Sequence, residues 1–345
     1  MKERNHMKPP FSITNKMLNL VVSITQSVTR LELEKERNLH LRKENRIRSI
    51  HSSLAIEKNS LSLEQVTDII NGKHVLGAPK EIHEVQNAYE AYERVFRMNP
   101  YAVDDFLNAH ALMMKGLVKE YGRFRSGDVG VYDSNGNVIH IGARPQFVQG
   151  LIADLFEWAK NDDIPDLIKS CVVHFELEMI HPFSDGNGRM GRLWQNLILS
   201  KWQDVFEWIP IETMVYEHQQ TYYDMLEIGD KENDSTKFIE FMLEIILETL
   251  LRFNQDIRVN DKLSDILSDK VVDKLNDNEK KFFLSIYDYL KENTSITNGQ
   301  AVELSERPAG TVRRYFVKFV ELNVLRSEGE NRNRKYFLKE DESRE

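Results

Sequence analysis

The chain is poor in the residues that cross-link or interrupt a fold. Its 345 residues include one cysteine, nine prolines and 16 glycines. A single thiol, Cys171, excludes an intramolecular disulfide and is typical of a reducing compartment. Because Cys171 lies in an apolar helical run, we interpret it as a buried, inert thiol.

Long apolar runs and an excess of positive charge are absent as well. No stretch approaches the ~20 apolar residues of a membrane helix, and no apolar segment follows the basic N-terminal residues as it would in a signal peptide. The formal net charge of -9 disfavours a surface that binds nucleic acid throughout, although it permits a local basic patch. We therefore expect a soluble, cytoplasmic protein with no membrane partner.

The chain does have length and helical periodicity. With 345 residues and a hydrophobic fraction of 41%, it predicts two or three domains with a sizeable core. Apolar spacing predicts helices over about 82–119, 147–160, 166–180, 189 onward and 219–253. An N-terminal helix is predicted with an apolar stripe of Leu18, Val21, Val22, Ile24, Val28 and Leu31.

Two segments depart from this pattern. Residues 129–132 and 138–141 are rich in β-forming side chains and flank the turn-forming residues 133–137, which predicts one β-hairpin. Residues 276–345 predict two short helices, a turn, a longer helix over 311–322 and strands over 324–326 and 335–338. That order is typical of a winged helix-turn-helix.

Residues 181–192 combine several groups that suit phosphate chemistry. The turn from Gly186 to Gly188 leads into an apolar-periodic helix, where free N–H groups and the positive helix end bind anions. Arg189 and Arg192 share a helix face and can reach the same phosphates. Asp185 offers a hard oxygen ligand for Mg²⁺, and His181 is placed to take a proton from a hydroxyl. Each feature alone is more often structural, but together they indicate a site.

The same segment resembles the signature of the Fic family, His-Pro-Phe-x-Asp/Glu-Gly-Asn-Gly-Arg-x-x-Arg, at every specified position. The resemblance covers about residues 50–250. It implies a mainly α, Fic-type helical bundle with one β-hairpin flap. It also implies an adenylyltransferase that moves AMP from Mg-ATP to a Ser, Thr or Tyr hydroxyl of a target protein or of itself. Related Doc-type kinases lack the second glycine and the final arginine, which are present here.

The resemblance assigns a role to each position. It implies that His181 is the general base, that Asp185 holds Mg²⁺ and that Arg189 and Arg192 orient the β- and γ-phosphates. The remaining nucleotide-binding positions are Gly186, Asn187, Gly188, Met190 and Gly191. The family flap, whose edge binds a target peptide as an added strand, corresponds to Val138, Ile139, His140 and Ile141. A purely structural hairpin is the alternative.

A structural role is the alternative for two further positions. Tyr222 falls where family members carry a tyrosine near the nucleotide, although adjacent tyrosines on a helix are often core residues. His174 precedes His181 by seven residues, without the His-Glu-x-x-His spacing of a zinc site, so we interpret it as structural.

Residues 52–59 resemble the inhibitory motif of the family, Ser/Thr-x-x-x-Glu-Gly/Asn. Ser53 and Glu57 are four residues apart and share a helix face. A Glu57 carboxylate paired with Arg192 would occupy the position of the γ-phosphate and suppress ATP binding. Lys58 stands where Gly or Asn is usual, although Asn59 follows directly. In some family members the same glutamate supports removal of AMP, and this sequence leaves that activity open.

These features predict an N-terminal helical region with the inhibitory motif (1–95), a catalytic core (96–252), a linker or connector helix (253–275) and a winged helix-like domain (276–345). An alternative is a DNA-binding regulator with a sensory or inactive Fic domain, because residues 307–335 contain eight Lys or Arg against three Glu. Many such domains only mediate protein contacts. Another alternative is a kinase or a different nucleotidyltransferase on the same fold. Helical proteins of this family often self-associate, so a homo-oligomer is also considered.

Overall fold

The computed structural model describes residues 8–33, 39–132, 138–272, 274–330 and 333–339, which belong to two compact units, Met1–Leu251 and Arg252–Glu345. The division falls inside a continuous helix, α11 (Thr236–Ser264), where the sequence predicted a linker or connector helix. No helix in the described ranges has the length and hydrophobicity needed to cross a bilayer.

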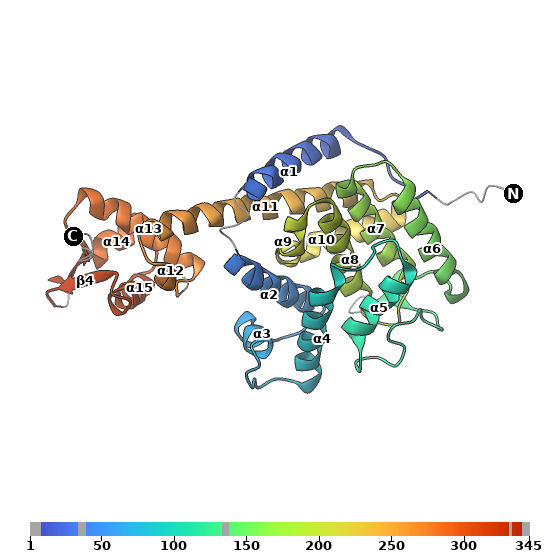
Figure 1. Cartoon of the computed structure of the whole chain (residues 1–345), viewed down its shortest axis with the longest axis horizontal. Helices are drawn as coiled ribbons and strands as arrows, with labels where there is room; N and C mark the ends of the chain where they lie inside the picture. The colour runs from blue at the N-terminus through green and yellow to red at the C-terminus, as the bar shows by residue number, and fades with distance from the viewer. Residues whose placement is uncertain (1–7, 34–38, 133–137, 273, 331–332, 340–345) are drawn as a thin grey trace. The chain divides into compact units, whose positions relative to one another are not determined.

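The first unit is built from helices and one β-hairpin (Figure 1). Before α11 its elements are α1 (Asn15–Leu33), α2 (Leu39–Ile56), α3 (Leu63–Ile70), α4 (Pro79–Val95), α5 (Val103–Met114), β1 (Gly130–Tyr132), β2 (Val138–Ile141), α6 (Pro145–Asn161), α7 (Asp166–Ile180), α8 (Asn187–Trp202), η2 (Asp204–Glu207), α9 (Ile211–Glu217) and α10 (Gln219–Glu232). The predicted helical block 82–119 is therefore two helices, because Pro100 lies between α4 and α5 and a proline interrupts helical hydrogen bonding.

Helices α7 and α8 pack against each other near the centre of the first unit (Figure 1). Almost every residue from Asn187 to Ser200 is buried, as expected of a helix that other helices surround. Cys171 on α7 is fully buried, and burial raises the pKa of its thiol to about 12. This buried environment agrees with the interpretation of Cys171 as an inert thiol. The short loop that joins α7 to α8 carries the signature residues.

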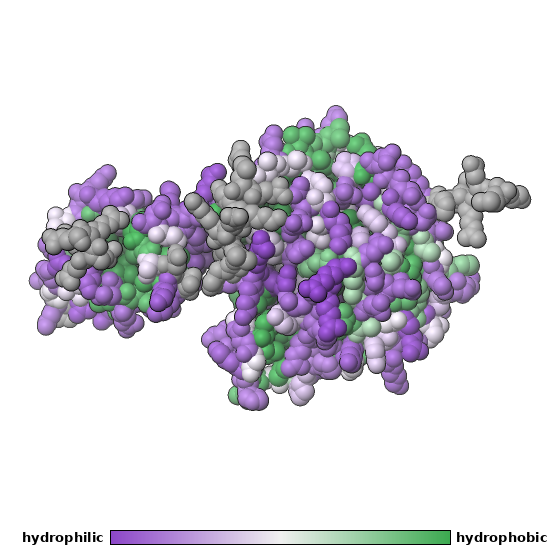
Figure 2. Space-filling model, viewed as in Figure 1, coloured by the Kyte–Doolittle hydropathy of each residue, from purple (hydrophilic) through white to green (hydrophobic). Residues whose placement is uncertain are grey.

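The predicted stripe of α1 is partly wrong. The buried face consists of Met17, Ile24, Val28 and Leu31, whereas Leu18 and Val22 are about half exposed. Figure 2 shows hydrophobic residues grouped over α1 on an otherwise largely hydrophilic face. Helical periodicity identified the helix but did not choose between its two neighbouring apolar faces.

The hairpin forms as predicted. Strand β1 pairs antiparallel with β2, and Val131 lies opposite His140. The predicted turn at 133–137 lies outside the described residues. In the described part of the chain this sheet has two strands, so one edge of β2 has no neighbouring strand.

The second unit has its own hydrophobic core. It contains α12 (Asp269–Val272), α13 (Asp277–Glu292), β3 (Ile296–Thr297), α14 (Asn298–Ser305), α15 (Ala309–Glu321), β4 (Leu325–Glu328) and β5 (Lys335–Leu338). The strands form an antiparallel sheet in the order β3-β5-β4. Buried aromatic residues from helices and sheet meet in the core, where the rings of Phe316 and Tyr336 stack. The predicted helices and the strand pair are therefore present with small shifts of their ends.

Candidate active site

Helix α7 ends at His181, which adopts a left-handed backbone with φ 52° and ψ 62°. Nδ1 of its ring lies 3.2 Å from the main-chain carbonyl of Glu178. A carbonyl can only accept a hydrogen bond, so Nδ1 carries the proton and Nε2 remains the basic nitrogen. Burial lowers the pKa of His181, so the imidazole is neutral near pH 7. The geometry therefore suits a general base.

Asn187, the first residue of α8, closes the loop that follows His181. Its Oδ1 accepts a hydrogen bond from the Phe183 N–H at 2.8 Å, and its Nδ2 donates to the Phe183 carbonyl at 2.9 Å. Phe183 is fully buried, and its ring stacks on His110 with centroids 3.6 Å apart. The asparagine thus determines the shape of the loop, and the free N–H groups that follow it point out of the helix end.

Asp185 presents one carboxylate just before α8. Its Oδ1 accepts hydrogen bonds from the Gly186 N–H at 2.6 Å and from Arg189 Nη2 at 3.1 Å, and the side chain is 47% exposed. The described ranges contain no group of three or more His, Cys, Asp or Glu that would hold a metal with protein ligands alone. A single accessible carboxylate fits Mg²⁺, because that ion commonly takes its other ligands from water and phosphate.

His110 on α5 supports Asp185 and was not singled out from the sequence. The Gly122 N–H donates to its Nδ1 at 3.0 Å, so Nε2 carries the proton and donates to the Asp185 carbonyl at 3.1 Å. Burial lowers the pKa of His110 to about 4, which keeps the ring neutral. A histidine on an apolar helix gave no signal of this role.

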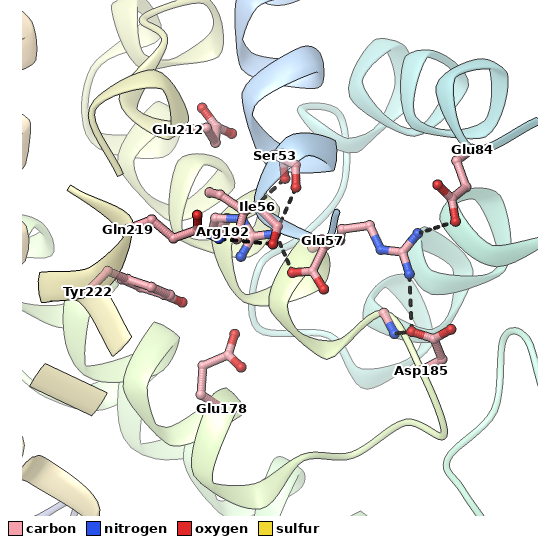
Figure 3. Close-up of polar contacts among 12 residues, drawn as sticks. Ser53, Ile56, Glu57, Glu84, Glu178, Asp185, Arg192, Glu212, Gln219 and Tyr222 are labelled. Atoms are coloured by element: carbon pink, nitrogen blue, oxygen red, sulfur yellow. Dashed lines mark hydrogen bonds and ion pairs between the residues drawn. The ribbon is translucent and has the colours of Figure 1, made fainter. Parts of the chain in front are cut away.

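Arg192 is held by the end of α2 (Figure 3). Its guanidinium is 3% exposed and donates to Ser53 Oγ at 3.2 Å, to the Ser53 carbonyl at 3.1 Å and to Glu57 Oε1 at 2.8 Å. Burial acts to lower the pKa of Arg192, but the charge and hydrogen bond of Glu57 together with the charges of Tyr222 and Glu178 raise it. The predicted pair of Glu57 and Arg192 is therefore present.

The Glu57 carboxylate also lies directly over the start of α8. A Cβ atom on Gly188 would come within 2.5 Å of Glu57 Oε1 and 3.0 Å of Arg192 Nη1. Only a glycine leaves room for an oxygen to approach the helix N-terminus this closely. An anionic oxygen thus occupies the region predicted for a phosphate.

Arg189 has different partners from Arg192. It is 4% exposed and lies 3.1 Å from Asp185 Oδ1 and 3.7 Å from Glu84 Oε1. Glu84 in turn accepts a hydrogen bond from Asn59 Nδ2 at 2.9 Å. Asn59, which follows the inhibitory motif, is thus linked through Glu84 to Arg189.

Helix α2 ends in a strained turn. Lys58 adopts a left-handed backbone with φ 68°, a conformation that Gly or Asn adopts more readily. This geometry explains why the family pattern favours those residues there. The carbonyl of Ile56 accepts hydrogen bonds from Gln219 Nε2 at 3.0 Å and from the Tyr223 hydroxyl at 3.4 Å, both on α10. Ser52 adds a hydrogen bond to Thr213 on α9.

A buried network holds the neighbouring helices in place. Glu212 on α9 accepts hydrogen bonds from the Tyr92 hydroxyl and from Asn196 Nδ2, each at 2.6 Å. These bonds connect α9 to α4 and α8, and α2 packs on α9. The support on which α2 lies is therefore tied to the same helix that carries Arg192.

The two adjacent tyrosines of α10 have different surroundings. Tyr222 is 1% exposed and its hydroxyl lies 3.0 Å from His174 Nε2. His174 is fully buried, and Nδ1 lies 2.7 Å from Gln195 Oε1, in agreement with a structural role. Tyr223 is 43% exposed and lines the cavity beside His181. Of the two, Tyr223 is the one that a ligand in that cavity would meet.

Met190 and Gly191 serve the packing of α8 in this structure. Met190 is 1% exposed. A Cβ atom on Gly191 would come within 2.5 Å of Glu178 Oε1 and 2.9 Å of the His174 ring. Gly191 therefore permits the close approach of α8 to α7, and its predicted contact with a nucleotide stays a prediction.

A cavity of about 420 Å³ opens beside His181. It is lined by flap residues Val131, Ile139 and His140 and by Glu178, Tyr223 and Asp230, among others. The flap residues Val138, Ile139 and Ile141 are exposed, whereas both ring nitrogens of His140 face acceptors, Asp230 Oδ2 at 2.9 Å and the Met179 carbonyl at 2.8 Å. The cavity brings the predicted base and the predicted flap together.

Glu178 was missed by the sequence analysis. It lies one helical turn before His181 and is 8% exposed, and its Oε1 has no hydrogen-bond partner among the described residues. Burial raises its pKa to about 7, while the charge of Arg192 acts in the opposite direction. A glutamate in an apolar helix next to the signature was the available signal.

The fold and the site correspond to known proteins. The pattern of the Fic/DOC family matches residues 100–199. The crystal structure of a Fic family protein from Desulfovibrio desulfuricans G20 superposes with a TM-score of 0.71 at 35% identity, over 98% of this chain and 100% of that one. This chain therefore belongs to the Fic family.

Curated relatives carry the name protein adenylyltransferase. The match to a probable protein adenylyltransferase of Aquifex aeolicus is 31% identical and covers 43% of this chain and 45% of the relative. The match to protein adenylyltransferase fic-1 of Caenorhabditis elegans is 26% identical and covers 56% of this chain and 38% of the relative. The matched region thus spans less than half the length of either relative.

Proposed function

We propose that this protein transfers AMP from Mg-ATP to a hydroxyl group of a target protein or of itself. The observation that carries the proposal is a neutral His181 with a free Nε2, beside a helix N-terminus that carries one accessible carboxylate and two buried arginines. The names of the curated relatives support the same reaction.

Each residue of the site has a separate role in the proposed reaction. Nε2 of His181 takes the proton of the target hydroxyl while the oxygen forms a bond to the α-phosphorus. The bond from that phosphorus to the oxygen shared with the β-phosphate breaks, and pyrophosphate leaves. Arg189, Arg192 and the N–H groups at the start of α8 bind the phosphates and balance the charge on the leaving group. Asp185 would hold Mg²⁺, which neutralises phosphate charge when it is bound.

The resting protein is proposed to be inhibited by Glu57. Its carboxylate contacts Arg192 at 2.8 Å and lies against Gly188, so it competes with a phosphate for the same donors. Burial of the arginine strengthens this pair, because a charged hydrogen bond is screened little when water is excluded. Activity then requires that Glu57 leave or turn away.

Label position tests the reaction. We would incubate the purified chain and a Glu57→Gly variant with Mg²⁺ and ATP labelled on either the α- or the γ-phosphate. The proposal expects label from the α-phosphate on protein, no label from the γ-phosphate, and loss of the α-phosphate label when His181→Ala is added to the Glu57→Gly variant. Label from the γ-phosphate would instead identify a kinase. No α-phosphate label on Glu57→Gly, or on the proteins of a cell lysate added to the same reaction, would refute AMP transfer.

A second candidate function, DNA binding, rests on the second unit. The element order from α13 to β5 resembles a winged helix-turn-helix, and Arg313 and Arg314 are exposed on α15. Lys318 on the same helix is paired with Glu279 at 2.6 Å. A mobility-shift assay with the full chain and an Arg313→Glu/Arg314→Glu variant tests it. Equal shifts, or none for either protein, would exclude this role for α15.

A further inference from the structure

Arg125, in the segment between α5 and the flap, is a buried cation with an unusual set of partners. Its side chain is 3% exposed. Nε donates to the His181 carbonyl at 2.7 Å, Nη1 donates to the Gly127 carbonyl at 2.7 Å, and Nη2 donates to the carbonyls of Ala143 and Ile180. Its main-chain N–H also donates to the Pro182 carbonyl at 3.1 Å. All of these acceptors are main-chain carbonyls.

The acceptors belong to three segments that meet at the site. Ile180, His181 and Pro182 form the end of α7 and the start of the catalytic loop. Gly127 lies before β1 and Ala143 lies after β2, so they are the two ends of the flap. A planar guanidinium, with donors that point in several fixed directions, can bind all three segments at once.

The contact between the flap end and His181 is close. The Ala143 N–H donates to the Ile180 carbonyl at 3.2 Å. A Cβ atom on Gly142 would come within 2.9 Å of His181 Cβ and 3.0 Å of Arg125 Nη2. His181 itself has a left-handed backbone that a non-glycine residue keeps only when its surroundings hold it. The main-chain carbonyl that Arg125 Nε binds belongs to this residue.

We infer that Arg125 is a positioning residue, which holds the backbone of His181 in its left-handed conformation and ties the catalytic base to both ends of the target-docking flap. This inference rests on the proposed function. The base and the flap must keep a constant separation if a hydroxyl bound along β2 is to reach Nε2 of His181. Arg125 provides the shared attachment for both.

Arg125 also affects the charge state of His181. Burial is the main cause of the lowered pKa of His181, and the charges of His140 and Arg125 lower it further. The hydrogen bond to the Glu178 carbonyl and the charge of Glu57 act in the opposite direction. Removing the positive charge of Arg125 should therefore raise the pKa of His181, so that the base is protonated at a higher pH.

The test uses Arg125→Lys and Arg125→Gln in the full chain, each combined with Glu57→Gly so that inhibition does not mask the effect. Lysine keeps the charge but loses the forked geometry, and glutamine loses both. Self-modification with Mg-ATP is measured as kcat, as the KM for ATP and as a function of pH. Arg123→Gln is the matched control, because Arg123 is an exposed arginine of the same segment.

Both Arg125 variants are expected to lose kcat by about tenfold to a hundredfold, the effect of a displacement near 1 Å in a catalytic group. The KM for ATP should change little, because Arg189 and Arg192 are intact. Only Arg125→Gln should move the acidic limb of the pH profile to higher pH. Arg123→Gln should match the Glu57→Gly parent in all three measurements.

The outcomes separate the two proposals. If the Glu57→Gly parent shows no AMP transfer that His181→Ala removes, the proposed function is wrong rather than the role of Arg125. Unchanged kcat and pH profile in a folded Arg125→Gln would overturn the positioning role. Variants that keep the kcat of the parent and show only a raised KM for ATP would overturn it as well, and calorimetry would show whether ATP binding itself is weaker. If neither Arg125 variant folds, as judged by circular dichroism, Arg125 serves the stability of the whole unit and the inference is equally rejected.

Discussion

The catalytic loop and the end of α2 each place a left-handed residue beside the active site, His181 with φ 52° and Lys58 with φ 68°. The two segments are held in different ways. His181 belongs to a loop that Asn187 closes and that Arg125 attaches to the flap. Lys58 follows a helix end whose carbonyl at Ile56 accepts two hydrogen bonds from α10 side chains. The His181 backbone is therefore held through main-chain carbonyls that Arg125 binds, whereas the helix end that carries Glu57 is held by side chains of α8 and α10.

The largest expected effect comes from removing the inhibitory carboxylate. Glu57→Gly should raise AMP transfer about tenfold to a hundredfold, because a charge-assisted hydrogen bond contributes roughly 1.5–3 kcal/mol. Self-modification with labelled ATP measures it. Glu57→Gln keeps the size but not the charge and should give a smaller rise. An unchanged rate in a folded Glu57→Gly protein would contradict inhibition by this residue.

The buried Glu178, one helical turn before His181 on α7, allows a test of how ionisation affects stability near the base. Its pKa in the folded protein is raised to about 7 from 4.5, so the folded state binds the proton more tightly than the unfolded state does. Its contribution to stability is therefore present below pH 4.5 and is lost as the pH rises through 7.

Glu178→Gln should then be more stable than the parent chain by on the order of 2 kcal/mol at pH 8. The difference should shrink below about 1 kcal/mol at pH 5. Urea unfolding at the two pH values measures both. A variant that is equally destabilised at pH 5 and pH 8 would show that Glu178 remains ionised or is needed for packing.

Relief of the strain at Lys58 should strengthen inhibition. A left-handed non-glycine residue costs about 1 kcal/mol, so Lys58→Gly should stabilise the inhibited state and lower AMP transfer about fivefold. The same substitution combined with Glu57→Gly should leave the rate unchanged, because no inhibitory contact remains. A rise in activity for Lys58→Gly would mean that the lysine, and not the strain, governs inhibition.

The smallest effect is expected from the hydrogen bond between Tyr223 and Ile56. Tyr223→Phe removes a 3.4 Å contact and should raise basal AMP transfer about twofold, equivalent to about 0.5 kcal/mol. Tyr222→Phe is the matched control, because its hydroxyl faces the buried His174. It should lower the free energy of unfolding by about 1 kcal/mol without raising activity. A similar rise in both variants would exclude a specific role for Tyr223.

Local pattern was sufficient for much of the fold. The helices around the signature and the hairpin at 129–141 follow from apolar spacing and from β-forming residues, which act over a few neighbours. The inner face of α1 was not predictable, because Met17 and Leu18 are both apolar and only the neighbouring helices decide which is buried. The break between α4 and α5 was predictable from the sequence, because Pro100 lies there and proline interrupts helical hydrogen bonding.

The same distinction between local pattern and tertiary contacts applies to the candidate site. By itself, the sequence was enough to propose the loop from His181 to Arg192 as the catalytic loop, because His181, Asp185, Asn187 and the arginines are close neighbours and their proposed roles depend on short-range geometry. Only the tertiary structure decided that Glu57 lies against Gly188, that Tyr223 rather than Tyr222 lines the cavity and that Arg125 binds the loop and the flap together. These contacts join distant segments, and several of them use main-chain carbonyls, which every residue possesses and no sequence pattern can distinguish.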